Sequence, residues 1–420
     1  MGRSFSIIVV DDCADAAEAA ARKLRALGFK AEGCDPATLT TVSRRGPVDA
    51  VVAYAEIPPQ EDALVMAVGE SGPQYADIRL RADAHAIQIA ARLRAAIRLS
   101  VLDSTAAVRV QDAAAAGSAY TPAAPREEQA SILFVGAPCP AFMRLQHAMA
   151  GANTEVIAAF STFNAFDYLH ERAFDAVVLN TEPTPDLAHT VCSAMRRNTR
   201  LYHTPALLLV RGDAYGGADE AFARGASDLL NADAGAQEMR DRVTALASER
   251  RRRRAAKAML EGCRTPALLD EDSDLFNAAF GERHLASLLA EGRARGHALS
   301  VIGLKLSAPH EAGAAKTRAA LKQFAGMLRH CVRAEDLAAR AGHDAFYLAL
   351  PSTRADEARM VAARVSAIAE CTAYEGADPH RPFRLSLATR VIEPGEGWSA
   401  SDAVSAALAP AGPRPVAAVG

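Results

Sequence analysis

Strand-like apolar runs alternate with helical patterns along the first part of the chain, and this alternation limits the folds it can adopt. The run SIIVVDD at residues 6–12 precedes a helical pattern at 15–29, and a second strand-like run at 48–59 precedes another helical pattern at 85–102. Strands joined through helices lie parallel in one sheet, with helices on both of its faces. Residues 1–103 are therefore expected to form an α/β domain, called here the first module.

The same plan occurs again further along the chain. Strand-like runs at 131–138 and 174–185 are each followed by a helical or polar stretch. Two segments of one architecture indicate an internal duplication. We expect this second module to span 131–250. The residues between the modules, 104–130, are rich in Ala and Pro and show no clear period, which is typical of a linker.

The last third of the chain has a different order of elements. Two strand-like runs meet at a tight turn around Ala341–His343, which predicts a β-hairpin. Helical patterns precede and follow these runs, so residues 264–398 are expected to form an α+β third module. We expect a connecting helix at 251–263 and a loose, Ala- and Pro-rich tail at 399–420.

Five consecutive arginines, Arg250 to Arg254, stand next to the expected connecting helix. Such a run either binds an anionic partner or forms the solvated face of a helix between two domains. The helical context favours the second interpretation, and the sequence does not assign a role to the run.

The composition of the 420 residues excludes several classes of protein. Half of the residues are hydrophobic, the formal net charge is −3, and the seven cysteines stand singly. Globular domains have such compositions, whereas nucleic-acid binding favours a strongly basic surface. No apolar run approaches the roughly 20 residues of a membrane-spanning helix. We therefore expect a cytoplasmic protein without nucleic-acid binding, membrane insertion or a bound metal.

The first two modules resemble the receiver domains of response regulators. In that family an aspartate at the end of the third strand accepts a phosphoryl group beside a bound metal ion. The acceptor position falls on Tyr54 in the first module and on Asn180 in the second. Neither residue offers a carboxylate, so we expect two degenerate receivers. The resemblance then leaves protein–protein contact as their role and implies a homodimer.

Other positions of the receiver pattern differ as well. The acidic pair that would hold the metal survives as Asp11 and Asp12 in the first module, and whether it retains metal binding stays open. The second module has Gly136 and Ala137 at the same place. The lysine that would pair with the phosphate falls near Arg81 in the first module.

The third module resembles the GGDEF domain of diguanylate cyclases. The opening motif of that family matches Asp270, Leu275 and Asn277. The signature motif reads Gly342, His343, Asp344, Ala345 and Phe346 in this chain. The resemblance implies two flavodoxin-like, doubly wound receiver domains followed by a GGDEF domain with the α+β fold of nucleotide cyclases.

The residues that would catalyse cyclisation have largely changed. Cyclase chemistry needs divalent cations held by carboxylates, yet Lys305 and Ala345 stand where the resemblance places metal ligands. His343 replaces a glycine that would let phosphate approach the backbone. We expect Asp344 to pair with Lys305 rather than to hold magnesium. The protein is accordingly expected not to be an enzyme.

A product-binding motif of the same family is retained. It reads RxxD placed five residues before the paired glycines, and here Arg333 to Asp336 precede Gly342 at that spacing. A further ligand arginine of the family matches Arg364. A guanidinium donates two hydrogen bonds to guanine O6 and N7, and a carboxylate accepts from the opposite edge of the base. With both side chains pointing outward from a turn, the resemblance implies cyclic di-GMP as a regulatory ligand of Arg333, Asp336 and Arg364.

The function implied is that of a cyclic di-GMP effector in bacterial cell-cycle signalling. Such a protein would lie at the cell pole and recruit partners as an adaptor for regulated proteolysis. Three alternatives stay open: a divergent active diguanylate cyclase, a regulator driven by phosphorylation, and a scaffold that binds no nucleotide.

Overall fold

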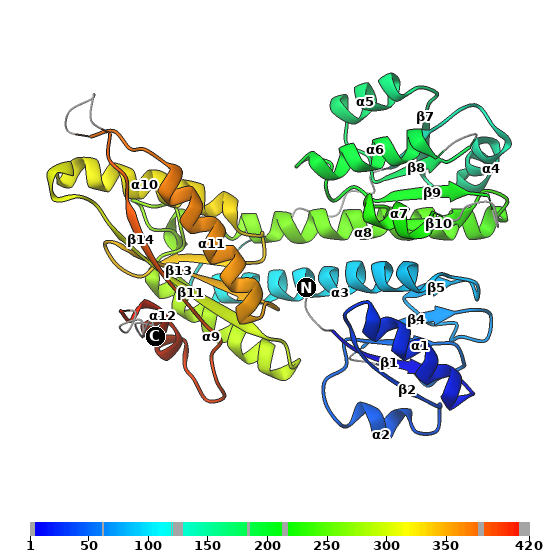
Figure 1. Ribbon diagram of the computed structural model, residues 1–420, viewed down its shortest axis with the longest axis horizontal. Helices are drawn as coiled ribbons and strands as arrows, with labels where there is room; N and C mark the ends of the chain where they lie inside the picture. Colours follow the sequence, from blue (N-terminus) through cyan, green and yellow to red (C-terminus); the bar gives the residue numbers. More distant parts are fainter. Residues whose placement is uncertain are drawn as a thin grey trace, which may run out of the picture. The chain divides into compact units, whose positions relative to one another are not determined.

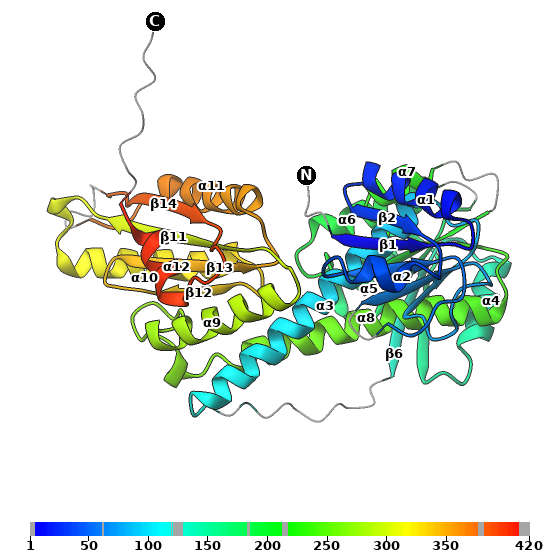
Figure 2. The same cartoon turned by 90° about the horizontal axis from the view of Figure 1, so that it is seen from below.

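The computed structural model describes residues 5–60, 63–118, 120, 129–182, 185–211, 217–376 and 382–410. These residues form two compact units. The N-terminal unit contains Ser4–Ser100 with Ala123–Ala255, and the C-terminal unit contains Val101–Pro122 with Ala256–Gly420. The elements of both units are labelled in Figures 1 and 2.

The first module contains a parallel sheet of five strands in the order β2-β1-β3-β4-β5, the order of flavodoxin-like folds. Helices α1 and α3 pack on one face of the sheet and α2 packs on the other. The described connections on both sides of β4 contain no helix, so this module has fewer crossover helices than the second. Its elements are β1 (Ser6–Val10), α1 (Ala14–Ala26), β2 (Lys30–Cys34), α2 (Leu39–Ser43), β3 (Ala50–Ala53), β4 (Leu64–Val68), β5 (Ile78–Leu80) and α3 (Ala86–Ala115).

The second module is a complete doubly wound domain, with a parallel sheet in the order β10-β9-β8-β6-β7. Helices α4 and α8 cover one face of the sheet, and α5, α6 and α7 cover the other. Its elements are β6 (Ala130–Val135), α4 (Pro140–Met149), β7 (Thr154–Ala159), α5 (Thr162–Glu171), β8 (Ala176–Asn180), α6 (Asp186–Arg197), β9 (Ala206–Val210), α7 (Ala218–Ala223), β10 (Asp228–Asn231) and α8 (Ala236–Gly262). The predicted two-sided α/β architecture of both modules is confirmed.

A buried polar network joins these two modules within the N-terminal unit. Asp228 is 1% exposed and accepts hydrogen bonds from Gln88 Nε2 and from Arg242 Nη1, each at 2.6 Å. Arg92 of α3 donates from Nη1 to Glu249 Oε2 of α8 at 3.2 Å, and its Nε lies 3.8 Å from Asp228 Oδ2. Because buried charges are costly unless they are paired, this network fixes α3 against α8 and β10.

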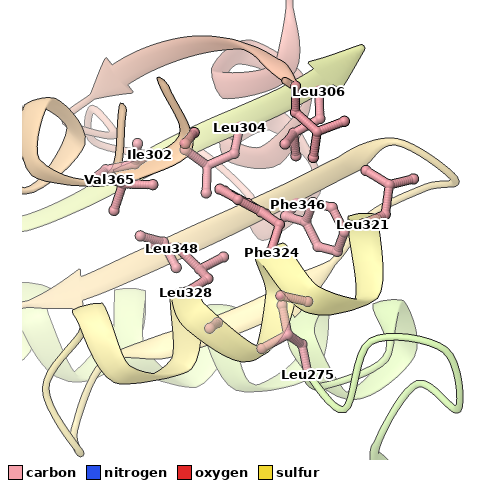
Figure 3. Packing of buried hydrophobic residues seen from close by; sticks show 14 of the residues in the cluster. Leu275, Ile302, Leu304, Leu306, Leu321, Phe324, Leu328, Phe346, Leu348 and Val365 are labelled. Carbon is pink, nitrogen blue, oxygen red and sulfur yellow. The ribbon is translucent and has the colours of Figure 1, made fainter. Parts of the chain in front are cut away.

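The third module contains an antiparallel sheet in the order β12-β13-β11-β14. Helices α10 and α11 pack on one face, where Leu304, Phe324 and Phe346 meet in the core drawn in Figure 3. Helices α9 and α12 and the last turns of α3 pack on the other face. The elements are α9 (Ala278–Ala294), β11 (Leu299–Ser307), α10 (Ala314–Cys331), β12 (Leu337–Arg340), β13 (Ala345–Pro351), α11 (Ala355–Cys371), β14 (Ser386–Ile392) and α12 (Ala400–Leu408).

The structure corrects the expected linker and the expected tail. Residues 104–115 continue α3, and Ala113 is buried against the third module. The Ala-rich composition that suggested a linker has high intrinsic helix propensity, and the small side chains allow close packing. Residues 400–408 form α12, which the side chain of Ser399 caps by accepting a hydrogen bond from the backbone of Asp402. Residues 119, 121–128 and 411–420 lie outside the described part of the chain.

Replacing Gly303 by alanine is expected to displace α12. A Cβ atom at this position of β11 would lie 2.1 Å from the backbone oxygen of Ala407, and such overpacking costs about 1–3 kcal/mol. We expect lower thermal stability and faster hydrogen exchange across α12. Gly326→Ala is the control: Gly326 lies in α10 with no atom within 4 Å of an added Cβ, so stability should rise by about 0.5–1 kcal/mol. Unchanged exchange in α12 of the Gly303 variant would contradict this packing.

No helix in the described parts of the chain is both long and apolar enough to span a membrane.

Candidate functional site

The RxxD segment forms the turn between α10 and β12. Helix α10 ends at Cys331, and the backbone N–H of Asp336 donates to the carbonyl of Arg333 at 3.2 Å. The side chains of Arg333 and Arg364 are both exposed. Arg364 of α11 donates from Nη2 to the carbonyl of Cys331 at 2.5 Å, two residues before Arg333. The structure therefore brings the two predicted ligand arginines to the same corner of the third module.

A buried arginine from α3 holds the backbone of this turn. Arg109 is 2% exposed. Its Nη1 donates to the carbonyl of Ala334 at 3.1 Å, and its Nη2 donates to the carbonyls of Glu335 and Asp336 at 2.9 and 3.1 Å. Burial lowers the pKa of Arg109 to about 10. Since the group stays charged at neutral pH, three carbonyls of the turn receive charge-assisted hydrogen bonds.

Arg109 also donates a hydrogen bond to a buried histidine of α9. Arg109 Nε donates to His284 Nε2 at 3.2 Å, so the proton of the neutral imidazole resides on Nδ1 and is donated to Asp112 Oδ2 at 2.7 Å. Asp112 Oδ1 accepts from Ser287 Oγ at 2.8 Å. Burial is the main cause that lowers the pKa of His284 to about 4, and Arg109 lowers it further. The chain Arg109–His284–Asp112 thus locks the last turns of α3 onto α9.

The Asp336 carboxylate does not point outward as expected. The residue is 7% exposed, its Oδ2 accepts from the backbone N–H of Arg333 at 2.7 Å, and its Oδ1 is buried with no hydrogen-bond partner. Burial, with a smaller contribution from Glu335, raises the pKa of Asp336 to about 7. The physical reason is local, because a carboxylate that accepts a hydrogen bond from the first residue of its own turn must fold back toward the backbone.

Asp336→Asn is expected to change how stability depends on pH. The folded-state pKa of Asp336 lies above its unfolded value, so the native state binds more protons between about pH 4 and pH 7, and the wild-type free energy of unfolding falls as pH rises through that window. Asparagine does not titrate, so the variant lacks this pH-dependent contribution to the free energy of unfolding. The stability of the variant relative to wild type should therefore increase between pH 4 and pH 7, by at most about 4 kcal/mol. Denaturant titrations of both proteins at several pH values measure it, and equal pH slopes would contradict it.

The GGDEF-like signature forms the turn between β12 and β13, as predicted. Gly342 and His343 are exposed at the turn, whereas Phe346 is 1% exposed in the core. A pocket of about 310 Å³ lies beside the turn, lined by His343, Asp344 and His310 among others. Asp344 is the single carboxylate among its lining residues whose side chains the structure describes.

Residues of the opening motif have structural roles. Asp270 Oδ1 accepts from Arg340 Nη1 at 2.7 Å and from Ser273 Oγ at 2.7 Å. The Asn277 side chain caps α9 by accepting from the backbone N–H of Phe280. The expected ion pair between Lys305 and Asp344 is not formed, because Lys305 projects to solvent from β11 and Asp344 lies in the turn before β13.

The receiver acceptor positions lie where the strand pattern placed them. Tyr54 follows β3, and burial together with the nearby charge of Asp11 raises the pKa of its phenol. Asn180 ends β8, and its Nδ2 donates to the carbonyl of Glu182 at 3.3 Å. A Cβ added to Gly136, the residue after β6, would lie 2.7 Å from Asn180 Cβ. Asn180 therefore occupies the space that a side chain at position 136 would need. Among the described residues no group of three or more His, Cys, Asp or Glu is placed to hold a metal ion.

Sequence reasoning missed the residues that contact the RxxD turn from α3. Arg109 and Asp112 lie more than 200 positions before the turn, inside a segment that was expected to be a linker. The only local signal is an arginine and an aspartate three positions apart among small apolar residues, a spacing that places both on one helix face.

A family model matches the third module. Residues 267–407 match the family model described as diguanylate cyclase, GGDEF domain. The GGDEF domain of DgcB from Caulobacter crescentus, solved in complex with c-di-GMP, is 16% identical; the match covers 34% of this chain and 85% of that chain, with a TM-score of 0.32.

Two response regulators are also among the similar solved structures. CheY4 of Vibrio cholerae, a chemotaxis response regulator, is 19% identical over 28% of this chain and 98% of its own, with a TM-score of 0.26. A putative response regulator from Chloroflexus aurantiacus is 23% identical over the same shares, with a TM-score of 0.27. A search of curated proteins finds no match. The chain carries a GGDEF domain of the diguanylate cyclase type at residues 267–407, preceded by two domains with the flavodoxin-like fold.

Proposed function

We propose that the protein is a cyclic di-GMP effector without cyclase activity. The ligand binds at the turn before β12, through Arg333 and Asp336, with Arg364 beside them. One observation carries the proposal. Two exposed arginines, Arg333 and Arg364, lie together at this turn. The pocket beside the β12–β13 turn has one described carboxylate, Asp344.

The chemistry of the turn suits a guanine dinucleotide. Arg333 can present its guanidinium fork to guanine O6 and N7, and such a bidentate contact is worth about 1–3 kcal/mol. Arg364 adds positive charge for a phosphate. Asp336 can accept from the guanine N–H groups only after its carboxylate turns outward. Because Oδ1 has no partner in the buried position, this rotation gives up a single hydrogen bond, the one from the Arg333 backbone.

The residues that line the pocket beside the β12–β13 turn argue against cyclase activity. Diguanylate cyclases place two divalent cations between carboxylates and nucleotide phosphates. In this pocket His343 and His310 stand near Asp344, and no second described carboxylate lines the space. Purified protein supplied with GTP and magnesium is therefore expected to form no cyclic di-GMP, and product formation would establish the alternative of a divergent active cyclase.

The order of domains supports a more specific role. A receiver–receiver–GGDEF chain that keeps RxxD and lacks the catalytic carboxylates resembles PopA, a non-cyclase paralogue of the cyclase PleD. By that resemblance the protein moves to the cell pole in cell-cycle control and recruits a proteolysis adaptor, with the receiver-like modules as contact surfaces in a homodimer.

Calorimetric titration with cyclic di-GMP tests the effector function. We expect binding with a free energy of about −8 to −9 kcal/mol, and a loss of roughly 100-fold or more for Arg333→Ala. The matched control is Arg318→Ala, since Arg318 is an exposed arginine of α10 outside the turn; its affinity should stay within about twofold of wild type. Absence of binding to folded wild-type protein would leave the nucleotide-independent scaffold as the better account.

A further inference from the structure

Members of the five-arginine run in α8 have different neighbours. Arg251 Nε and Arg254 Nη2 lie 3.2 and 2.7 Å from the two carboxylate oxygens of Asp175, just before β8. Arg250 and Arg253 instead line a groove within the N-terminal unit. Two of the five arginines therefore share Asp175 as a partner, and two others contribute to the lining of the groove.

This groove has a volume of about 650 Å³ and lies between the first half of α3, the connection from α6 to β9, helix α7 and helix α8. Its size falls within the range of roughly 300–1,000 Å³ typical of small-molecule sites. Its charge is strongly unbalanced. Two carboxylates, Asp219 and Glu249, face seven arginines, which are Arg92, Arg94, Arg98, Arg196, Arg224, Arg250 and Arg253.

Only part of the positive charge of the groove is paired within the described chain, where Arg224 contacts Glu220 at 2.7 Å. Glu249 is already bound by Arg92. Arg98 is exposed and makes no hydrogen bond or ion pair with the described residues, and Arg250 Nε is buried without a partner. Burial lowers the pKa of Arg250, and the neighbouring Arg254 lowers it further. Like charges held this close repel one another, so an anion in the groove would relieve the repulsion.

The groove is also rigid and carries an exposed aromatic ring. Arg196 is fixed by donating to the carbonyls of Gly225, Tyr202 and Thr204 at 2.7–2.9 Å. The side chain of Tyr202 is 53% exposed, and its ring meets His203 edge-on at 4.9 Å. The side chain is therefore accessible to a ligand, and accessible aromatic rings stack on nucleobases.

We propose that this groove is a second nucleotide site, which binds a nucleoside polyphosphate. Arg98 and Arg250 contact the phosphate chain, since guanidinium groups match phosphate oxygens in bidentate geometry. Tyr202 stacks on the base. The site is separate from the RxxD turn and does not depend on the function proposed for it.

Titration of the full chain with ATP tests the site at low ionic strength, with pyrophosphate and adenosine as partial ligands. ATP is chosen because a guanine nucleotide could also enter the GGDEF domain. We expect ATP to bind, pyrophosphate to bind more weakly and adenosine to give no heat. The double variant Arg98→Ala/Arg250→Ala should weaken ATP binding roughly 30-fold or more. Tyr202→Ala should weaken the binding of ATP and leave that of pyrophosphate unchanged.

Two control variants give the test its specificity. Arg252 belongs to the same run but is exposed and outside the groove, so Arg252→Ala should keep ATP affinity within about twofold. Arg333→Ala should do the same. Arg98→Ala alone changes an exposed side chain and should leave the fold intact. If the double variant unfolds, weaker ATP binding by this single variant tests the proposal. An equal loss with Arg252→Ala, a loss with Arg333→Ala, or no ATP binding by folded wild type would overturn the proposal.

Discussion

Arg109→Ala is expected to destabilise the C-terminal unit by roughly 3–5 kcal/mol. The substitution leaves the buried carbonyl of Asp336 and His284 Nε2 without their donor, together with the partly buried carbonyls of Ala334 and Glu335. Each unsatisfied buried group costs about 1–3 kcal/mol. Removing the costly buried charge offsets part of this sum. For a unit of this size the melting temperature should fall by roughly 6–20 °C in calorimetry.

The pKa of His284 provides a second readout for the same variant. Arg109 is one of the causes that hold the pKa of this imidazole near 4. Without the guanidinium, His284 should take up a proton at a higher pH, which NMR titration of the ring detects. Gln111 is exposed on the same helix, so Gln111→Ala should change stability by less than about 0.5 kcal/mol. A wild-type melting temperature and an unchanged His284 titration in Arg109→Ala would show that the contact contributes nothing.

Asp228→Ala should have an effect of similar size in the N-terminal unit. Arg92 and Arg242 are 2% and 8% exposed, and without Asp228 the Arg242 guanidinium loses its carboxylate partner. Breaking a buried ion pair from one side costs about 3–5 kcal/mol. Because Gln88 also loses one of its two acceptors and keeps the carbonyl of Leu229, the packing of α3 against β10 should weaken along with the fold of the second module.

An exposed ion pair of the same module is the control. Asp233 pairs with Arg144 at 2.9 Å, and its side chain is 59% exposed. Asp233→Ala should therefore cost no more than about 1 kcal/mol. Equal shifts of the melting temperature in Asp228→Ala and Asp233→Ala would mean that the buried Asp228 network stabilises the protein no more than an exposed ion pair does.

The architecture was largely predictable because it depends on local patterns. Alternating apolar runs and helical periods are repeated in each module, and the hairpin turn at Ala341–His343 has short-range signals. The extension of α3 was not predictable in this way. Its residues 104–115 are mostly small, and small side chains give a weak period even when one face is buried. For α12 a readable signal existed, since Ser399 and Asp402 have the spacing of a capping box.

The candidate site was predictable in part, for a physical reason. Arg333, Asp336 and Arg364 were identified by spacing, and the structure places both arginines at one corner. The contact of Arg109 with the backbone of this turn was not predictable, because Arg109 approaches from a distant part of the chain. The sequence does not indicate that Arg254 pairs with Asp175 while Arg250 lines a groove, since a run of identical residues carries no information about which neighbour each one meets.

The shared use of α3 has a consequence for biosynthesis. Residues 101–115 belong to the C-terminal unit, but the ribosome makes them long before the strands they cover. At synthesis rates of roughly 5–20 residues per second, β13 at Ala345–Pro351 emerges on the order of 10–50 s later. Until then the face of α3 around Ala113 lacks strands that bury it in the finished fold. The same reasoning sets the minimal fragment for expression: a GGDEF domain that begins at residue 264 lacks the helix that closes one face of its core.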